Sequence, residues 1–164
     1  MARGSGAKFM LLLMLILVAI YIVFIFFPSQ KKTIPKPALA ADQPIGVEHI
    51  DWVARQLGAA AVSNNPSTGR PAIVEIVVTP DDQRFNIVID SGVITTAAGG
   101  ADNPDVRVIG GREVVEELLS ASDFIAAAKD LDSRDKIHVE AFRGTEFLEA
   151  MGYTQLYARY GRSA

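Results

Sequence analysis

The chain has 164 residues and no cysteine, which excludes disulfides, thiolate nucleophiles and zinc–thiolate sites. Residues 1–36 carry five cations and no acid, whereas residues 37–164 carry 11 Lys or Arg against 19 Asp or Glu, a net charge of −8. An acidic region of this kind is a poor candidate for binding nucleic acid, and its size allows one domain with a core.

A long apolar run dominates the first part of the chain. Residues 9–27 are uncharged and nearly all Leu, Ile, Val, Met or Phe. As a helix they would extend roughly 28 Å, close to the hydrocarbon thickness of a bilayer. We therefore expect a short basic tail at residues 1–8 and a single-pass transmembrane helix at residues 9–27. A cleaved signal peptide is the alternative, although the run is long for one and the small residues near Ala40 are a distant cleavage site.

Residues 28–46 are predicted to be a spacer. They hold four of the eight prolines and show no apolar periodicity, which is typical of an extended linker. Cations flank the apolar run on both sides, so the positive-inside rule is nearly balanced. The very short N-terminal tail slightly favours a cytoplasmic N-terminus and an extracytoplasmic domain at residues 47–164.

The remaining elements follow from the periodicity of the apolar residues. Helical spacing from Val47 to Val62 predicts an amphipathic helix. Alternation then predicts an antiparallel meander of three strands, at residues 73–79, 84–90 and 93–97. Further elements are a short strand with Val106 and Val108 inward, a helix with Val114 to Leu119 on its apolar side, a helix capped by Asp123, a strand at residues 137–141 and a closing helix from near Thr145. This order predicts an α+β fold, with a five-stranded, mostly antiparallel sheet covered on one face by helices.

Four segments of this domain resemble the sterol carrier protein type 2 family. They are the strand and turn at residues 84–92 (RFNIVIDSG), the strand at residues 103–110 (NPDVRVIG), the helix at residues 113–120 and residues 126–140, which lead into the last strand. The residues at 133–136 depart from the family pattern, and an N-terminal membrane anchor is not typical of the family. The resemblance implies a sterol-carrier-like fold in which sheet and helices enclose an apolar tunnel for lipids, sterols or acyl chains.

Periodicity and resemblance together nominate seven residues for the wall of such a cavity, although they do not separate a wall from a solid core. These candidates are Phe85, Ile87, Val106, Val108, Leu118, Phe124 and Met151. Under the resemblance, the closing helix with Tyr153, Tyr157 and Tyr160 would close the tunnel, and the alternative is an ordinary packed C-terminal helix. Trp52 and Arg55 on the first helix are candidates for a partner interface, with local packing as the alternative.

Catalytic and metal-binding patterns are weak in this sequence. His138 shares a strand face with Glu140 and is expected to be exposed, and His49 in the first turn of its helix is expected to be solvated. The acids at positions 81, 82, 102 and 105 fit no calcium loop and are common turn formers. We therefore expect that the protein is not an enzyme and that it binds no cofactor and no metal.

Two functional hypotheses remain. The first is a membrane-anchored, non-enzymatic module that binds or transfers a lipid-like or acyl-chain ligand, with the lipid bilayer as its other partner. The alternative is an accessory subunit of a larger membrane protein complex, with a filled domain that has no ligand and docks on a membrane protein partner.

Overall fold

The computed structural model describes residues 34–40 and 42–160. The chain divides into two units, Met1–Ile34 and Pro35–Ala164, and the description below concerns the second. The predicted basic tail and transmembrane helix lie outside the described residues. Among the residues that are described, no helix is long and apolar enough to cross a bilayer.

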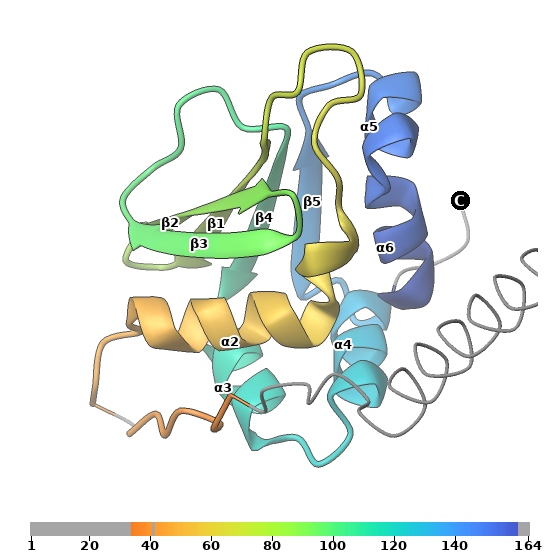
Figure 1. The fold of residues 1–164 in the computed structure, drawn as a ribbon. Helices are drawn as coiled ribbons and strands as arrows, with labels where there is room; N and C mark the ends of the chain where they lie inside the picture. The colour runs from red at the N-terminus through yellow and green to blue at the C-terminus, as the bar shows by residue number, and fades with distance from the viewer. Residues whose placement is uncertain (1–33, 41, 161–164) are drawn as a thin grey trace, which may run out of the picture. The chain divides into compact units, whose positions relative to one another are not determined.

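The second unit has an α+β fold with one five-stranded sheet (Figure 1). The strands are β1 (Ala72–Thr79), β2 (Gln83–Asp90), β3 (Val93–Ala98), β4 (Val106–Gly111) and β5 (Ile137–Ala141). The helices are α2 (Val47–Leu57), the 3-10 turn η1 (Ala59–Ala61), α3 (Arg112–Ser120), α4 (Phe124–Ser133), α5 (Thr145–Met151) and α6 (Tyr153–Tyr160). Every strand that the alternation predicted is present, because alternate apolar residues give each strand one face to bury.

The sheet is mixed, with the strand order β3-β2-β1-β4-β5. The predicted meander is confirmed, since β1 pairs antiparallel with β2 and β2 with β3. The β4–β5 pair is antiparallel as well, whereas β1 and β4 pair in parallel at the centre of the sheet. The chain therefore leaves the meander at the β3 edge and returns on the other side of β1.

Side-chain alternation gives the sheet two different faces. One face carries Val74 and Ile76 of β1, which lie in register with Val106 and Val108 of β4, and helices α2 to α6 gather against it. The opposite face carries charged residues of the same strands, among them Glu75. The apolar face is the one that positions the candidate site.

The start of α2 corrects the expectation that His49 is solvated. The His49 side chain is fully buried. Its Nδ1 accepts the backbone N–H of Gly46 at 2.8 Å, and its Nε2 lies 3.1 Å from the carbonyl oxygen of Ala38. The ring thus caps the helix and also contacts the segment before it, and this tertiary contact outweighs the usual preference of a first-turn polar residue for water.

That preceding segment contacts the domain. Lys36 Nζ donates to the carbonyl oxygen of Ala121 at 3.1 Å, Arg112 donates to the carbonyl oxygen of Ala40 at 3.1 Å, and Ile45 is buried. An extended, semi-rigid spacer was expected over residues 28–46. In the described part of that range, the carbonyls of Ala38 and Ala40 contact side chains of α2 and α3.

Two helix ends in the second half of the chain show how single residues set the boundaries. Asp123 caps α4 as predicted, because its side chain accepts the backbone N–H of Ala126 at 3.0 Å. The predicted closing helix is divided at Gly152, which has φ of +88°. That left-handed conformation ends α5 and lets α6 start in a new direction.

Candidate functional site

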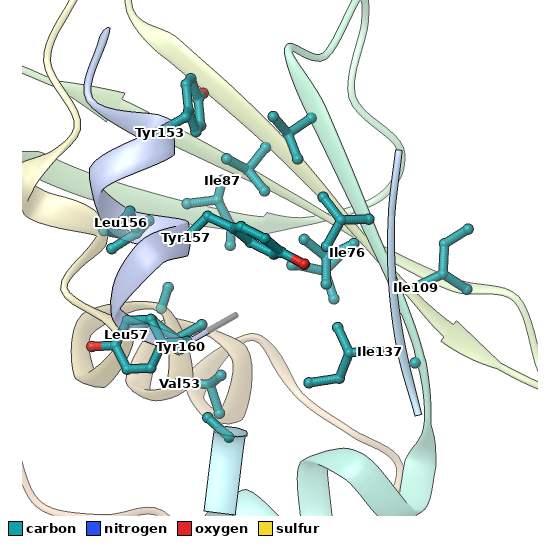
Figure 2. A pocket seen from close by; sticks show the side chains of 18 of the residues that line it. Val53, Leu57, Ile76, Ile87, Ile109, Ile137, Tyr153, Leu156, Tyr157 and Tyr160 are labelled. Atoms are coloured by element: carbon teal, nitrogen blue, oxygen red, sulfur yellow. The ribbon is translucent and has the colours of Figure 1, made fainter. Parts of the chain in front are cut away.

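A cavity of about 610 Å³ lies between the apolar face of the sheet and the helices (Figure 2). Its sheet side is formed by β-branched residues of the central strands, chiefly Val74, Ile76, Ile87, Ile89, Val106 and Val108. Its helical side is formed by residues of α2, α3 and α6, among them Val53, Leu57, Val114, Leu118, Leu156 and Tyr157. The wall is thus built from elements that are far apart in the sequence.

The cavity exists because α6 does not fill the space above the sheet. The main packing partners of α6 are α4 and α5. Val74, Ile76 and Val108 lie on the two central strands, yet they are only half-buried, whereas Ile87 and Ile89 on the neighbouring strand β2 are buried. Apolar side chains at the centre of a covered sheet are normally fully packed, so this pattern marks a hollow between the sheet and the helices.

The lining is almost entirely apolar. Among the described residues that line it there is no Lys, Arg or His, and Asp132 is the one charged member. The remaining polar side chains are Thr154 and the three tyrosines of α6. Binding in this space therefore depends on the burial of apolar surface, with a few hydroxyl groups to orient a ligand.

The structure distributes the seven candidate wall residues between the cavity and the solid core. Ile87, Val106, Val108 and Leu118 line the cavity. Phe85 and Met151 are buried in packed parts of the domain outside this lining, with 4% and 0% of their surface exposed. The Phe124 ring packs edge to face against Trp52, at 5.6 Å between ring centres.

The two candidate interface residues make contacts inside the domain. Trp52 is buried between the Phe124 ring and the ammonium group of Lys36, which lies 5.6 Å from the centre of the indole ring. Arg55 pairs with Asp51 at 2.7 Å and also donates to the carbonyl oxygen of Ile94. These contacts match the local-packing alternative.

A buried carboxylate holds one end of the cavity wall. Asp105 is fully buried and accepts hydrogen bonds from Arg70, from Arg143 at 3.1 Å, from the backbone N–H of Ile73 at 2.9 Å and from the hydroxyl of Tyr153 at 3.3 Å. Burial raises the pKa of Tyr153 far above its ordinary value, and the charge of Asp105 adds to the effect. Tyr153 therefore stays a neutral donor and ties the start of α6 to the sheet.

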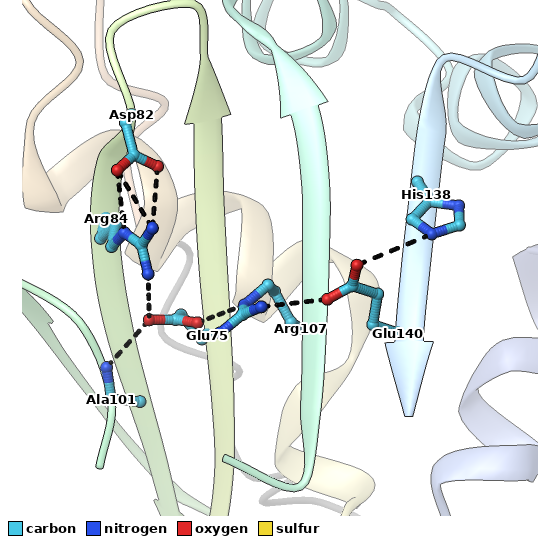
Figure 3. Close-up of polar contacts among 7 residues, drawn as sticks. All are labelled: Glu75, Asp82, Arg84, Ala101, Arg107, His138 and Glu140. Atoms are coloured by element: carbon cyan, nitrogen blue, oxygen red, sulfur yellow. Dashed lines mark hydrogen bonds and ion pairs between the residues drawn. The ribbon is translucent and has the colours of Figure 1, made fainter. Parts of the chain in front are cut away.

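The face of the sheet opposite the cavity carries an ion-pair network (Figure 3). The buried carboxylate of Glu75 accepts hydrogen bonds from Arg107 and from the backbone N–H of Ala101, and Arg107 also pairs with Glu140 at 3.0 Å. Burial alone would raise the pKa of Glu75, but these hydrogen bonds and the charges of Arg107 and Arg84 outweigh it and lower the pKa. His138 lies at the rim of the network and is exposed, as predicted.

Several acidic residues of this domain are engaged by cations and backbone groups. Asp105 and Glu75 belong to the two clusters above, and Asp82 pairs with Arg84 at 3.0 Å. Across residues 34–40 and 42–160, no three His, Asp or Glu side chains are placed to share a metal ion.

Comparison with known proteins gives structural matches alone. No family model matches the sequence, and comparison with curated proteins found no match. Among solved structures, the chain is similar to the palmitated sterol carrier protein 2 like 2 from Aedes aegypti, with 14% identity and a TM-score of 0.44 over 73% of this chain and 99% of the other. It is also similar to the UbiJ-SCP2 ubiquinone synthesis protein, with 10% identity and a TM-score of 0.39 over 88% and 94% of the two chains.

A larger protein contains a similar region. The stereoselective inverting sec-alkylsulfatase Pisa1 from Pseudomonas sp. matches with 13% identity and a TM-score of 0.42, over 81% of this chain. The chain spans only 20% of the length of that sulfatase.

Proposed function

We propose that this protein is a membrane-anchored, non-enzymatic module that binds or transfers a lipid-like hydrophobic ligand. The observation that carries the proposal is the cavity of about 610 Å³, whose described lining has no cationic side chain and a single charged residue. Its volume lies within the range of roughly 300–1,000 Å³ that is typical of small-molecule sites. The sequence resemblance to sterol carrier domains points to the same class of ligand.

The apolar wall sets a lower limit on the length of the hydrocarbon part of the ligand. Each buried methylene contributes about 0.8 kcal/mol, whereas association costs at least about 4 kcal/mol in lost translational and rotational freedom. About five buried methylenes therefore only offset that cost. An apolar wall of this kind favours a ligand with a long hydrocarbon part over a short polar metabolite.

The membrane attachment in this proposal rests on the apolar run at residues 9–27 and on the basic residues that precede it. The proposed location is a single-pass membrane protein whose domain is extracytoplasmic. A bilayer next to the domain would supply the ligand. The alternative, an accessory subunit, requires a domain with a filled core, and the cavity favours the lipid-binding hypothesis over it.

A cavity-filling variant tests the proposal. Val108→Phe places a ring inside the lining, whereas the matched control Val93→Phe adds the same ring to a side chain that is 65% exposed on the edge strand β3. The full chain, kept soluble in amphipol, is titrated with a pyrene-labelled long-chain lipid. We expect Val108→Phe to weaken uptake at least about tenfold, an effect of about 1.4 kcal/mol, and the control to bind like the wild type.

Two outcomes would contradict the lipid-binding proposal. One is a wild-type protein that takes up no lipid, and the other is equal uptake by Val108→Phe while its urea unfolding shows it to be folded. A defined membrane protein recovered with the wild type in mild detergent, together with no lipid uptake, would favour the accessory-subunit hypothesis.

A further inference from the structure

Three tyrosines of α6 line the cavity, and the protein itself uses the hydroxyl groups of two of them. Tyr153, Tyr157 and Tyr160 are spaced by four and three residues, which places them on one side of the helix. The Tyr153 hydroxyl donates to Asp105 at 3.3 Å, and the Tyr160 hydroxyl donates to the carbonyl oxygen of Gln56 at 3.5 Å.

The third tyrosine differs from the other two. No described residue makes a hydrogen bond with the hydroxyl of Tyr157. Its ring projects from α6 across the cavity, with the hydroxyl directed toward the sheet near Ile76 (Figure 2). Tyr157 is 44% exposed, and its phenol has no hydrogen-bond partner among the described residues. It is therefore free to bond a ligand in the cavity, and it both donates and accepts.

The charge of the lining limits which ligand groups this hydroxyl can meet. A carboxylate or phosphate that leaves water needs a cation beside it, because an unpaired buried charge is very costly. The described lining supplies no Lys, Arg or His, and its charged member, Asp132, repels anions. An uncharged oxygen needs only one hydrogen bond to be satisfied.

We propose that Tyr157 is a specificity-determining residue that selects lipids with an uncharged hydroxyl, ester or carbonyl oxygen over lipids whose buried end is anionic. This inference rests on the proposed lipid-binding function and narrows its ligand class. Thr154 also lines the cavity, but its side chain is short, whereas the Tyr157 side chain is long enough to present its hydroxyl within the cavity.

The test compares two ligands with the same hydrocarbon chain. The full chain in amphipol, at pH 8, binds a neutral pyrene-labelled hydrocarbon, which is then displaced with hexadecan-1-ol or with palmitate. We expect the wild type to bind hexadecan-1-ol about tenfold or more tightly than palmitate. Tyr157→Phe should weaken hexadecan-1-ol binding about fivefold, the effect of one neutral hydrogen bond, and change palmitate binding less than about twofold.

Matched controls separate this role from structural effects. Tyr160→Phe removes a hydroxyl of the same kind that is already bonded within the protein, and it should leave the preference between the two ligands unchanged. Equal or tighter binding of palmitate by the wild type would overturn the inference. The inference would also be overturned if Thr154→Val lost the preference for hexadecan-1-ol while Tyr157→Phe kept it. A wild type that binds neither ligand would instead refute the proposed function.

Discussion

Replacement of Asp105 by Ala tests how much the buried carboxylate contributes to the free energy of unfolding. Four groups from different parts of the chain converge on it, namely Arg70, the backbone N–H of Ile73, Arg143 and the hydroxyl of Tyr153. They belong to the approach to β1, to β1 itself, to the segment after β5 and to α6. The carboxylate thus joins the sheet to the helix that closes the cavity.

The expected loss in the free energy of unfolding depends on how exposed these partners are. Removal of one member of a buried ion pair costs about 3–5 kcal/mol, and an unsatisfied buried N–H such as that of Ile73 costs about 1–3 kcal/mol. The side chains of Arg70 and Arg143 are 30% and 28% exposed, so water compensates part of their loss. We therefore expect Asp105→Ala to cost about 3–4 kcal/mol, a large part of the 5–15 kcal/mol that is typical of a domain.

The assay is urea unfolding followed by the fluorescence of Trp52, the only tryptophan of the chain and a buried one. With a slope of about 2 kcal/mol per molar urea, the midpoint should fall by roughly 1.5–2 M. Asp102→Ala is the matched control, because Asp102 is exposed on the same loop, and its effect should stay within about 0.5 kcal/mol. A loss below about 1 kcal/mol for Asp105→Ala would refute the reasoning.

Three further predictions concern other parts of the domain. The pKa of Glu75 is lowered in the folded state, so the contribution of its carboxylate to the free energy of unfolding is complete above the ordinary carboxyl pKa and is lost as pH falls through the folded pKa. Urea unfolding measured from pH 6 to pH 3 should therefore show that the free energy of unfolding of Glu75→Gln falls less steeply with pH than that of the wild type. Gly152→Ala should lower stability by about 1–2 kcal/mol, since its φ is +88°, whereas Gly144→Ala at φ of −63° should change the melting temperature little. His49→Phe removes both ring hydrogen bonds and should accelerate elastase cleavage after Ala38; an unchanged rate would contradict the role of the ring in holding that segment.

Local patterns in the sequence were enough to predict the strands but not all of their partners. Alternation in residues 73–79 and 84–90 identifies two strands, and the short turn between them makes them neighbours. Nothing local indicates that β4 returns to pair in parallel with β1, because that contact depends on the space left beside the meander. The burial of His49 was missed for a similar reason, since the carbonyl of Ala38 that contacts it belongs to a segment with no periodicity.

The candidate cavity was predicted only in part. Phe85 and Ile87 alternate on the same face of β2, so periodicity treats them alike, yet Ile87 lines the cavity and Phe85 lies in solid core. The difference depends on contacts between β2 and elements far from it in the sequence, which no pattern within β2 records. The sequence assigns Tyr157 to the closing helix but not to the cavity wall. Its proposed role depends on the absence of a hydrogen-bond partner for its hydroxyl among the described residues, which the sequence does not show.

The position of α6 also has a consequence for local dynamics. The side of α6 that bears Tyr157 faces the cavity, and the helix packs mainly on α4 and α5, so its local unfolding should cost less free energy than that of the central strands. A ligand in the cavity would add contacts to this helix first and would suppress its opening by mass action. Slowed amide hydrogen exchange in α6, with little change in β1 and β4, would thus report occupancy of the cavity without any label on the ligand.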